Sequence, residues 1–314
     1  MKILVVGTVA YDTIETPEGR RENLLGGSAS YFATAASYFT DVGIVSVVGR
    51  DFDPSDRDML KSRGIDVTGI QTAAGGTFRW SGAYKDDLNT AVTLQTQLNV
   101  LEKFAPRVGP EQASAPFLFL ANIDPKLRHA ALDGMSKRPE MVACDTMNLW
   151  IEIARDSLTS LLPRVDTLLI NEGEAKQLTG ERQLPRAAAK LIETGLQTLI
   201  VKRGEYGAAL FNRQYGFAMP AFPLSKVIDP TGAGDTFAGG FMGYLAAVGD
   251  TGEEAVRRAV VAGSVMASFT VERFGLDRLA FLTSKEINGR FRAFAELMRF
   301  HPLGGGQGLP LRAA

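Results

Sequence analysis

The residues best suited to chemistry lie in the stretch Asp229–Phe241, where the turn Gly232-Ala233-Gly234 directly precedes Asp235. A glycine-rich turn leaves main-chain N–H groups unshielded, and the first turn of a helix has N–H donors without intrahelical partners. Such a turn binds anions, including the charge of a phosphoryl group in transfer. The carboxylate of Asp235 can accept the proton of a hydroxyl that attacks the phosphorus. The stretch therefore predicts phosphoryl transfer to an alcohol.

A purely structural interpretation of this stretch is also open. Glycine-rich turns often precede helices, and Asp235 in a first helical turn would stabilise the helix dipole without catalysis. The spacing excludes two other nucleotide motifs. The chain has no Gly-x4-Gly-Lys-Ser/Thr sequence, and the Gly-Ala-Gly turn lacks the third glycine of a dinucleotide fingerprint. A dinucleotide-dependent oxidoreductase is therefore disfavoured.

The whole stretch resembles the C-terminal signature of the PfkB/ribokinase family of carbohydrate and nucleoside kinases. In that family the residue matching Asp235 is the catalytic base beside the substrate hydroxyl, and the main chain matching Gly232, Ala233 and Gly234 forms an anion hole. The resemblance covers nearly all of the chain before its tail. It implies an ATP-dependent kinase that uses Mg²⁺ and phosphorylates a primary hydroxyl of a sugar or ribonucleoside. A catalytically silent sugar- or nucleoside-binding regulator on the same fold is the alternative.

A second group of residues is predicted to bind the substrate. Gly26-Gly27-Ser28 resembles the family's N-terminal signature, and its paired glycines allow the main chain to approach a sugar closely. Asp12 follows the first predicted strand, and its position matches the sugar-binding aspartate of the family. Tyr31 departs from the family pattern, which usually has an asparagine that touches sugar hydroxyls. Its flat phenol favours a substrate with a planar group, such as a nucleoside base, or packs inside its helix.

A third group is predicted to bind the nucleotide. Asn171 and Glu174 resemble the family's Asn-x-x-Glu motif, which lies near the phosphates and holds the water shell of Mg²⁺. A hard cation held through water by a carboxylate agrees with magnesium chemistry. The structural alternative is an acidic helix N-terminus. Lys202 and Gly204 end the next predicted strand, and the resemblance places this segment beneath the nucleotide.

Two residues just before the Gly-Ala-Gly turn complete the predicted site. In several family members the counterpart of Asp229 helps to bind an activating K⁺, so Asp229 is a candidate ligand for a monovalent cation. A plain turn residue is the alternative. Thr231 lies between Asp229 and the anion turn, and we expect it on the nucleotide side.

The pattern of elements predicts a parallel sheet that would gather these residues. Short apolar runs alternate with helical patterns, which is typical of helices covering a parallel sheet. The predicted strands are 3–7, 43–48, 117–121, 141–145, 167–171 and 198–202, with an antiparallel addition at 208–212. The predicted helices are 28–39, 56–63, 126–137, 151–162, 185–194 and 236–248. Asp12, Asn171, Lys202 and Asp235 then fall at or just past carboxyl strand ends, where ligands bind in such sheets.

Two segments interrupt this pattern. Residues 11–25 are polar and extended, and residues 77–98 alternate as in a hairpin. Together they predict a small strand lid inserted in an α/β, ribokinase-like fold, a three-layer, doubly wound, mostly parallel sheet. An ordinary surface hairpin is the alternative. We expect one kinase domain over residues 1–303, a flexible tail over 304–314 and, by resemblance, a homodimer through the lid.

The composition limits the partners. The chain has 34 basic and 35 acidic residues and a net charge of −1, which favours neither nucleic acid nor a membrane as partner. The single cysteine, Cys144, excludes an internal disulfide, follows an apolar run and is expected to be a buried thiol. His129 and His301 have no metal-ligand spacing. Residues 2–7 are too short for a signal sequence or a membrane span, so we expect a cytoplasmic protein.

Overall fold

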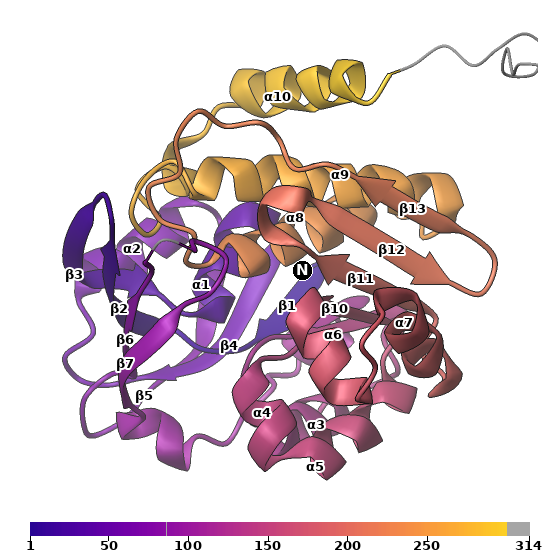
Figure 1. Cartoon of the computed structure of the whole chain (residues 1–314). Helices are drawn as coiled ribbons and strands as arrows, with labels where there is room; N and C mark the ends of the chain where they lie inside the picture. The colour runs from indigo at the N-terminus through magenta and orange to yellow at the C-terminus, as the bar shows by residue number, and fades with distance from the viewer. Residues whose placement is uncertain (86, 300–314) are drawn as a thin grey trace, which may run out of the picture.

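The computed structural model describes residues 1–85 and 87–299. A nine-stranded sheet forms the centre, with helices on both of its faces, and a second sheet of four strands lies to one side (Figure 1). The predicted end of the kinase domain at residue 303 and the predicted tail over 304–314 lie outside the described residues.

The central sheet confirms every predicted strand to within one residue at each end. Its order is β13-β12-β11-β10-β9-β8-β1-β4-β5; the seven strands from β11 to β5 in this order run parallel, and β12 pairs antiparallel with both β11 and β13. The strands are β1 (Ile3–Val6), β4 (Val42–Val48), β5 (Asp66–Thr72), β8 (Phe117–Leu120), β9 (Met141–Asp145), β10 (Thr167–Asn171), β11 (Thr198–Lys202), β12 (Ala208–Asn212) and β13 (Gly216–Met219). The sequence analysis did not assign β5 and β13.

Helices make the two outer layers. One face carries α1 (Ser28–Ala36), α2 (Pro54–Ser62), α8 (Ala233–Val248) and α9 (Glu253–Thr270), with α10 (Ser284–Leu297) outside α9 (Figure 1). The other face carries α3 (Pro125–Asp133), α4 (Asn148–Ile153), α5 (Arg155–Leu161), α6 (Glu172–Thr179) and α7 (Leu184–Glu193). Alternate β1 residues divide between the two cores, Ile3 and Val5 into one and Leu4 and Val6 into the other.

Local sequence explains where two of these helices begin. Asp53 precedes α2 and accepts a hydrogen bond from the Ser55 amide at 2.8 Å, and Asp124 does the same for the Lys126 amide before α3. Each helix has proline near its first position, where no intrahelical N–H is needed. These caps hold the chain as it leaves the preceding strand or turn.

The small residues of α8 let it approach α1 closely. A Cβ atom on Gly239 would lie 2.3 Å from the main-chain oxygen of Phe32, a distance that no real Cβ atom shows. Main chain cannot move aside as a flexible side chain can, so this contact sets the spacing of the two helices. Because α8 carries the anion turn at its N-terminus, the same contact positions that turn.

Gly239→Ala is expected to lower the free energy of unfolding by about 1–3 kcal/mol through overpacking, although alanine favours helices. Gly289→Ala in α10 is the matched control, because a Cβ there meets nothing within 4 Å. That variant should be neutral or more stable by about 0.5–1 kcal/mol. Urea unfolding of both variants measures the difference, and equal effects would contradict the packing argument.

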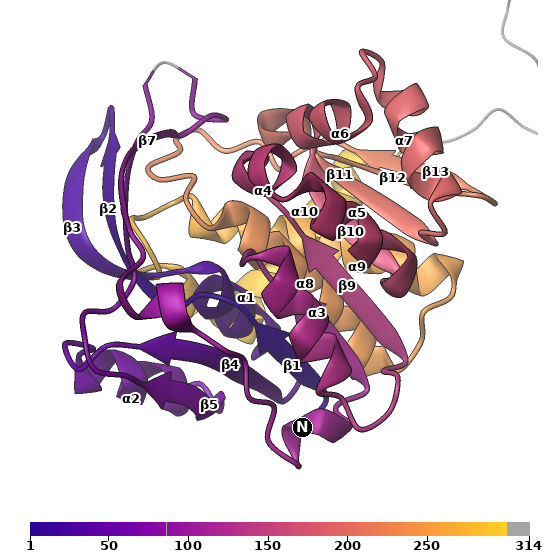
Figure 2. The ribbon, with the colours of Figure 1, turned by 90° about the horizontal axis from the view of Figure 1, so that it is seen from below.

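The second sheet is made by the two segments that interrupt the pattern. It contains β2 (Ala10–Thr16), β3 (Gly19–Gly26), β6 (Arg79–Ala83) and β7 (Val92–Gln97) in the order β3-β2-β6-β7, and it stands beside the central sheet (Figure 2). Asp12 and Trp80 are register partners in β2 and β6, so their side chains share one face. A Cβ on Gly82 would lie 2.0 Å from the Trp80 ring, which therefore lies along β6 over Gly82.

Two further expectations concern single features. Cys144 is buried in β9, as predicted, and burial raises the pKa of its thiol to about 12. Among residues 1–85 and 87–299, no helix combines the length and the apolar character that crossing a membrane requires.

Candidate active site

The carboxyl ends of neighbouring parallel strands meet the N-terminus of α8. β10 ends at Asn171 and β11 ends at Lys202, and these two residues are register partners. The side chain of Lys202 reaches across to α8, since a Cβ on Gly234 would lie 2.7 Å from the Lys202 Nζ atom. A cation therefore lies directly beside the glycine-rich turn, where it can neutralise an anion bound there.

The turn itself offers several main-chain donors. Gly232 precedes α8 with a φ of +74°, a conformation that glycine adopts without strain. The amide of Ala233 donates to the Pro230 oxygen at 3.2 Å. Within the described part of the chain, the amides of Gly232, Gly234 and Asp235 have no hydrogen-bond acceptor. Two of the three predicted anion-hole residues thus have unpaired amides, whereas that of Ala233 is already engaged.

Asp235 lies half-buried in the first turn of α8. Burial and then the nearby carboxylate of Asp145 raise the pKa of Asp235 well above its ordinary value, and Lys202 lowers it. A helix N-terminus by itself would favour the ionised form. Here the loss of water and a second carboxylate outweigh that partial charge.

Asp12 lies in β2 with only 4% of its surface exposed. A Cβ on Gly26 would lie 1.9 Å from the Asp12 Oδ2 atom, so only glycine leaves room for the carboxylate. Burial and then the charge of Asp229 raise the pKa of Asp12 to about 7, while a hydrogen bond from the Gly27 amide lowers it. The Gly-Gly pair is therefore built around Asp12.

Ser28, the next residue of that motif, has a structural partner. Its hydroxyl accepts a hydrogen bond from the Thr8 amide at 3.2 Å and lies 3.1 Å from the Thr8 hydroxyl. The Ser28 amide donates back to the Thr8 hydroxyl at 2.9 Å. These contacts tie the start of α1 to the turn after β1, and they explain Ser28 without any substrate.

Tyr31 projects from α1 into the same region and is 1% exposed. Its ring lies against the main chain of Gly232, where a Cβ would come within 2.4 Å of ring carbons. The buried ring has no free face for a planar substrate group, so that interpretation of Tyr31 loses its support. Its hydroxyl has no hydrogen-bond partner among the described residues. Burial, and then the charges of Asp12 and Asp229, raise the pKa of this hydroxyl.

Asn171 and Glu174 form a capping box at the start of α6. The Asn171 side chain accepts from the Glu174 amide, and Glu174 Oε2 accepts from the Asn171 amide, both at 2.8 Å. The first turn also holds two acidic residues, Glu172 and Glu174, as the structural alternative of an acidic helix N-terminus expects. Burial raises the pKa of Glu174 to about 7, and the charge of Lys202 lowers it. Glu174 Oε1 accepts no hydrogen bond within the described residues and is the oxygen that could bind a hydrated cation.

The remaining candidates shape the turns around the site. Asp229 is fully buried and accepts main-chain hydrogen bonds from Thr231 at 2.8 Å and Gly275 at 2.9 Å. The Thr231 hydroxyl donates to the Tyr84 hydroxyl at 3.2 Å, which joins the anion turn to the segment after β6. Gly204 has a φ of +54° and opens the turn after β11.

Two polar residues of this site were not predicted. Asp145 is the last residue of β9 and Tyr84 follows β6; both lie close enough to other candidates to change their pKa values. The position of Asp145 at a predicted strand end was a signal that could have identified it. Across the described ranges, no group of three or more His, Cys, Asp and Glu side chains could hold a metal ion directly.

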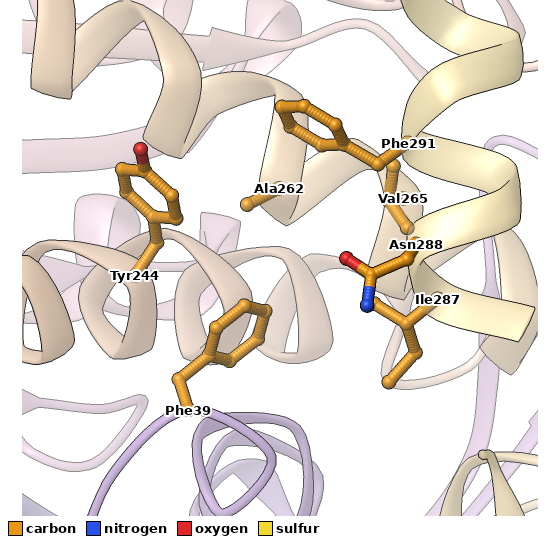
Figure 3. Close-up of a pocket in the computed structure, with 7 residues that line it drawn as sticks. All are labelled: Phe39, Tyr244, Ala262, Val265, Ile287, Asn288 and Phe291. Atoms are coloured by element: carbon orange, nitrogen blue, oxygen red, sulfur yellow. The ribbon is translucent and has the colours of Figure 1, made fainter. Parts of the chain in front are cut away.

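A cavity of about 120 Å³ lies away from this site, on the helical face formed by α8, α9 and α10 (Figure 3). It is lined by Phe39, Tyr244, Ala262, Val265, Ile287, Asn288 and Phe291. None of these residues belongs to the candidate site, and most of them are apolar. We therefore assign no part of the chemistry to this cavity.

Comparison with known proteins agrees with the geometry. A family model described as pfkB family carbohydrate kinase matches residues 1–277. The cytidine kinase of Thermococcus kodakarensis is 31% identical over 250 residues, which cover 78% of this chain and 88% of that protein. The match therefore covers most of this chain and nearly the full length of the relative.

Solved structures establish the fold. A nucleoside kinase of Burkholderia thailandensis in complex with ADP-inosine has a TM-score of 0.78 and 20% identity, and the match covers 99% of each chain. A presumed ribokinase II of E. coli in complex with ATP and Mg²⁺ has a TM-score of 0.73 and 20% identity, and the match covers 94% of this chain and 99% of that chain. The predicted ribokinase-like fold class is thereby confirmed.

Proposed function

Because the chain belongs to the pfkB family of carbohydrate kinases and is a phosphotransferase with an alcohol group as acceptor, we propose that it transfers the γ-phosphate of ATP to a primary hydroxyl of a sugar or ribonucleoside. One observation carries this proposal. The carboxyl of Asp235 lies beside the unpaired amides of Gly232 and Gly234, and Lys202 reaches the same turn. A base, an anion site and a cation thus meet at one point.

In this proposal Asp235 accepts the proton of the acceptor hydroxyl as its oxygen bonds to the γ-phosphorus. The bond from that phosphorus to the bridging oxygen breaks, and ADP leaves with the electron pair. The transition state of phosphoryl transfer is loose, so the proton can leave late and a carboxylate suffices as base. The amides of Gly232 and Gly234 stabilise charge on the transferring group.

Asp12 is proposed to bind two adjacent sugar hydroxyls, with the main chain of Gly26 and Gly27 close to the sugar ring. The unpartnered Tyr31 hydroxyl lies near Asp12 and would supply a further hydrogen bond. Ser28 would contribute mainly by holding the start of α1 in place through its hydrogen bonds to Thr8. This arrangement directs the hydroxymethyl group of the acceptor towards Asp235.

ATP and Mg²⁺ are the proposed cofactors, with Thr231 and Gly204 on the nucleotide side. Glu174 fits a magnesium site because it is buried with one oxygen that accepts no hydrogen bond within the described residues, and Asn171 is exposed at the same strand end. They would hold the hydrated ion through water, and the ion would screen phosphate charge. Lys202 would neutralise phosphate from the other side of the turn.

The four-stranded sheet is the proposed lid, and it favours a nucleoside over a free sugar. Trp80 shares a face with Asp12 and is its register partner, so a substrate held by Asp12 lies beside a half-buried aromatic ring. Stacking of a planar base on such a ring is possible for every nucleobase and contributes about 1–3 kcal/mol to binding. Trp80 thus replaces Tyr31 as the residue expected to recognise a base.

ADP release measured with adenosine, inosine, cytidine, ribose and fructose tests the proposal. We expect the highest kcat/KM for a ribonucleoside, and Trp80→Ala should raise the KM of that nucleoside about 10-fold or more. Arg20→Ala at the exposed edge of the same sheet is the control. If no ATP were consumed with any of these acceptors, the result would favour the catalytically silent regulator instead.

Two subsidiary proposals concern assembly and ions. All residues of β7 are exposed, including Leu94 at 58%, and this edge strand would pair two chains in a homodimer through the lid. Light scattering of the wild type and of Leu94→Glu tests this.

Asp229 is the proposed K⁺-responsive residue, and replacing K⁺ by Na⁺ in the assay decides whether it has that role or only orders the turn.

A further inference from the structure

Asp145 is a buried carboxylate that contacts Asp235, the base of the proposed mechanism, but has no role in that mechanism as described above. Asp145 ends β9, and 3% of its surface is exposed. Its carboxyl is hydrogen-bonded to that of Asp235, which projects from the first turn of α8. Two carboxyl groups can share such a bond only when one of them holds a proton. The pair is therefore a place where a proton must reside.

A buried arginine supports Asp145 from behind. Arg128 on α3 has no exposed surface, donates from Nε to the Ile123 oxygen at 2.8 Å, and donates from Nη1 to the main-chain oxygen of Asp145. Its Nη2 atom and the Asp145 Oδ1 atom have no hydrogen-bond partner within the described residues. A buried guanidinium stays charged, so it stabilises a negative charge on Asp145.

We infer that Asp145 is a positioning residue for phosphoryl transfer: held by Arg128, its carboxylate orients Asp235 and accepts a hydrogen bond from it once Asp235 has taken the acceptor proton. This inference rests on the proposed kinase activity. When both carboxyls are ionised, as the base requires, they share no hydrogen bond until the acceptor proton arrives, so this bond stabilises the transition state more than the ground state.

The proton and electron balance is complete within the site. The hydroxyl oxygen of the acceptor uses an electron pair to bond to phosphorus, and ADP leaves with the pair from the broken bond. The hydroxyl proton goes to Asp235, whose new O–H group donates to Asp145. After the products leave, Asp235 returns this proton to solvent and is ready for the next acceptor.

The charged surroundings of the pair set its response to pH. Burial, then the charge of Asp145 and the hydrogen bond to it, raise the pKa of Asp235, whereas Lys202 lowers it. Burial also raises the pKa of Asp145, and Arg128, Lys202 and the same hydrogen bond oppose that rise. The other titratable groups whose charges reach these residues are Asp12, Tyr31, Cys144 and Glu174.

The pH dependence of kcat/KM tests the inference, because Asp235 acts as base only when ionised. In the wild type, activity should rise with pH as Asp235 loses its proton. Asp145→Asn removes the negative charge and leaves only a neutral amide beside Asp235, so the acidic limb of the pH profile should move to lower pH by about one unit or more. The plateau value of kcat should fall about 10-fold or more, because the base is weaker. The KM for ATP should change little.

Asp166→Asn is the matched control, because Asp166 is a half-buried carboxylate at the opposite end of the same strands. It should leave the acidic limb in place even if it lowers stability. Asp145→Ser provides a second uncharged variant in case Asp145→Asn does not fold. An unmoved acidic limb in the folded variants overturns the inference, whereas a wild type that phosphorylates no acceptor overturns the proposed function.

Discussion

Asp235→Asn is expected to lower kcat by about 10²–10⁴-fold, the usual contribution of a general base. The amide has the same shape as the carboxyl and can still bond to Asp145, but it cannot accept the acceptor proton. The KM for ATP should change little, because the amides of Gly232 and Gly234 and the cation of Lys202 remain. ADP release measures turnover, and calorimetry with ATP and Mg²⁺ measures binding.

Asp250→Asn is a suitable control, because Asp250 lies just past the other end of α8 and, among residues 1–85 and 87–299, accepts a hydrogen bond only from the Gly252 amide, at 2.8 Å. It should retain full turnover. If Asp235→Asn turned over as fast as the wild type, Asp235 would not be the base. A loss of turnover accompanied by an equal loss of ATP binding would point to damage of the anion turn.

Asp12→Asn should raise the KM for the acceptor about 10- to 100-fold, because a charged hydrogen-bond acceptor for two hydroxyls is lost. The KM for ATP should be nearly unchanged, since Asp12 is proposed to contact the acceptor and not the nucleotide. Initial rates at varied acceptor concentration and fixed ATP measure the KM for the acceptor, and initial rates at varied ATP and fixed acceptor measure the KM for ATP. Equal effects on both would count against the sugar role of Asp12.

The same variant should also be more stable than the wild type at alkaline pH. Burial and Asp229 raise the pKa of Asp12 from 3.8 to about 7. Between these values the native state holds a proton that the unfolded state has lost, so the stability contributed by Asp12 falls as pH rises from about 4 to about 7. The full cost above that range is at most about 4 kcal/mol.

Thermal unfolding of the ligand-free protein at pH 8 and at pH 4 tests this. Asp12→Asn should raise Tm at pH 8, where the wild-type carboxylate is charged and buried. At pH 4 the wild-type side chain is largely neutral in the native state, so the gain should be small. The same gain at both pH values would show that ionisation of Asp12 is not the cause. A residue that destabilises the empty protein and binds substrate is expected at a functional site.

The features that depend on neighbouring residues could be predicted from the amino-acid sequence. Alternation of apolar strands and amphipathic helices is a local pattern, which is why the strands that end at Asp145, Asn171 and Lys202 were predicted with their exact bounds. The motif Asp229–Phe241 also carries its chemistry locally, because turn, helix start and carboxylate follow one another. The interruption of the pattern by residues 11–25 likewise predicted a separate sheet.

Contacts between groups that are distant in the chain could not be predicted in this way, because they depend on how the elements pack. Asp145 and Asp235 belong to different layers, and only the packing of α8 over the strand ends places one carboxyl against the other. The burial of Tyr31 against Gly232, and the shared face of Asp12 and Trp80, likewise depend on helix spacing and strand register. Since desolvation depends on every neighbour in space, no local pattern could reveal that Asp235 holds its proton more tightly than an ordinary aspartate.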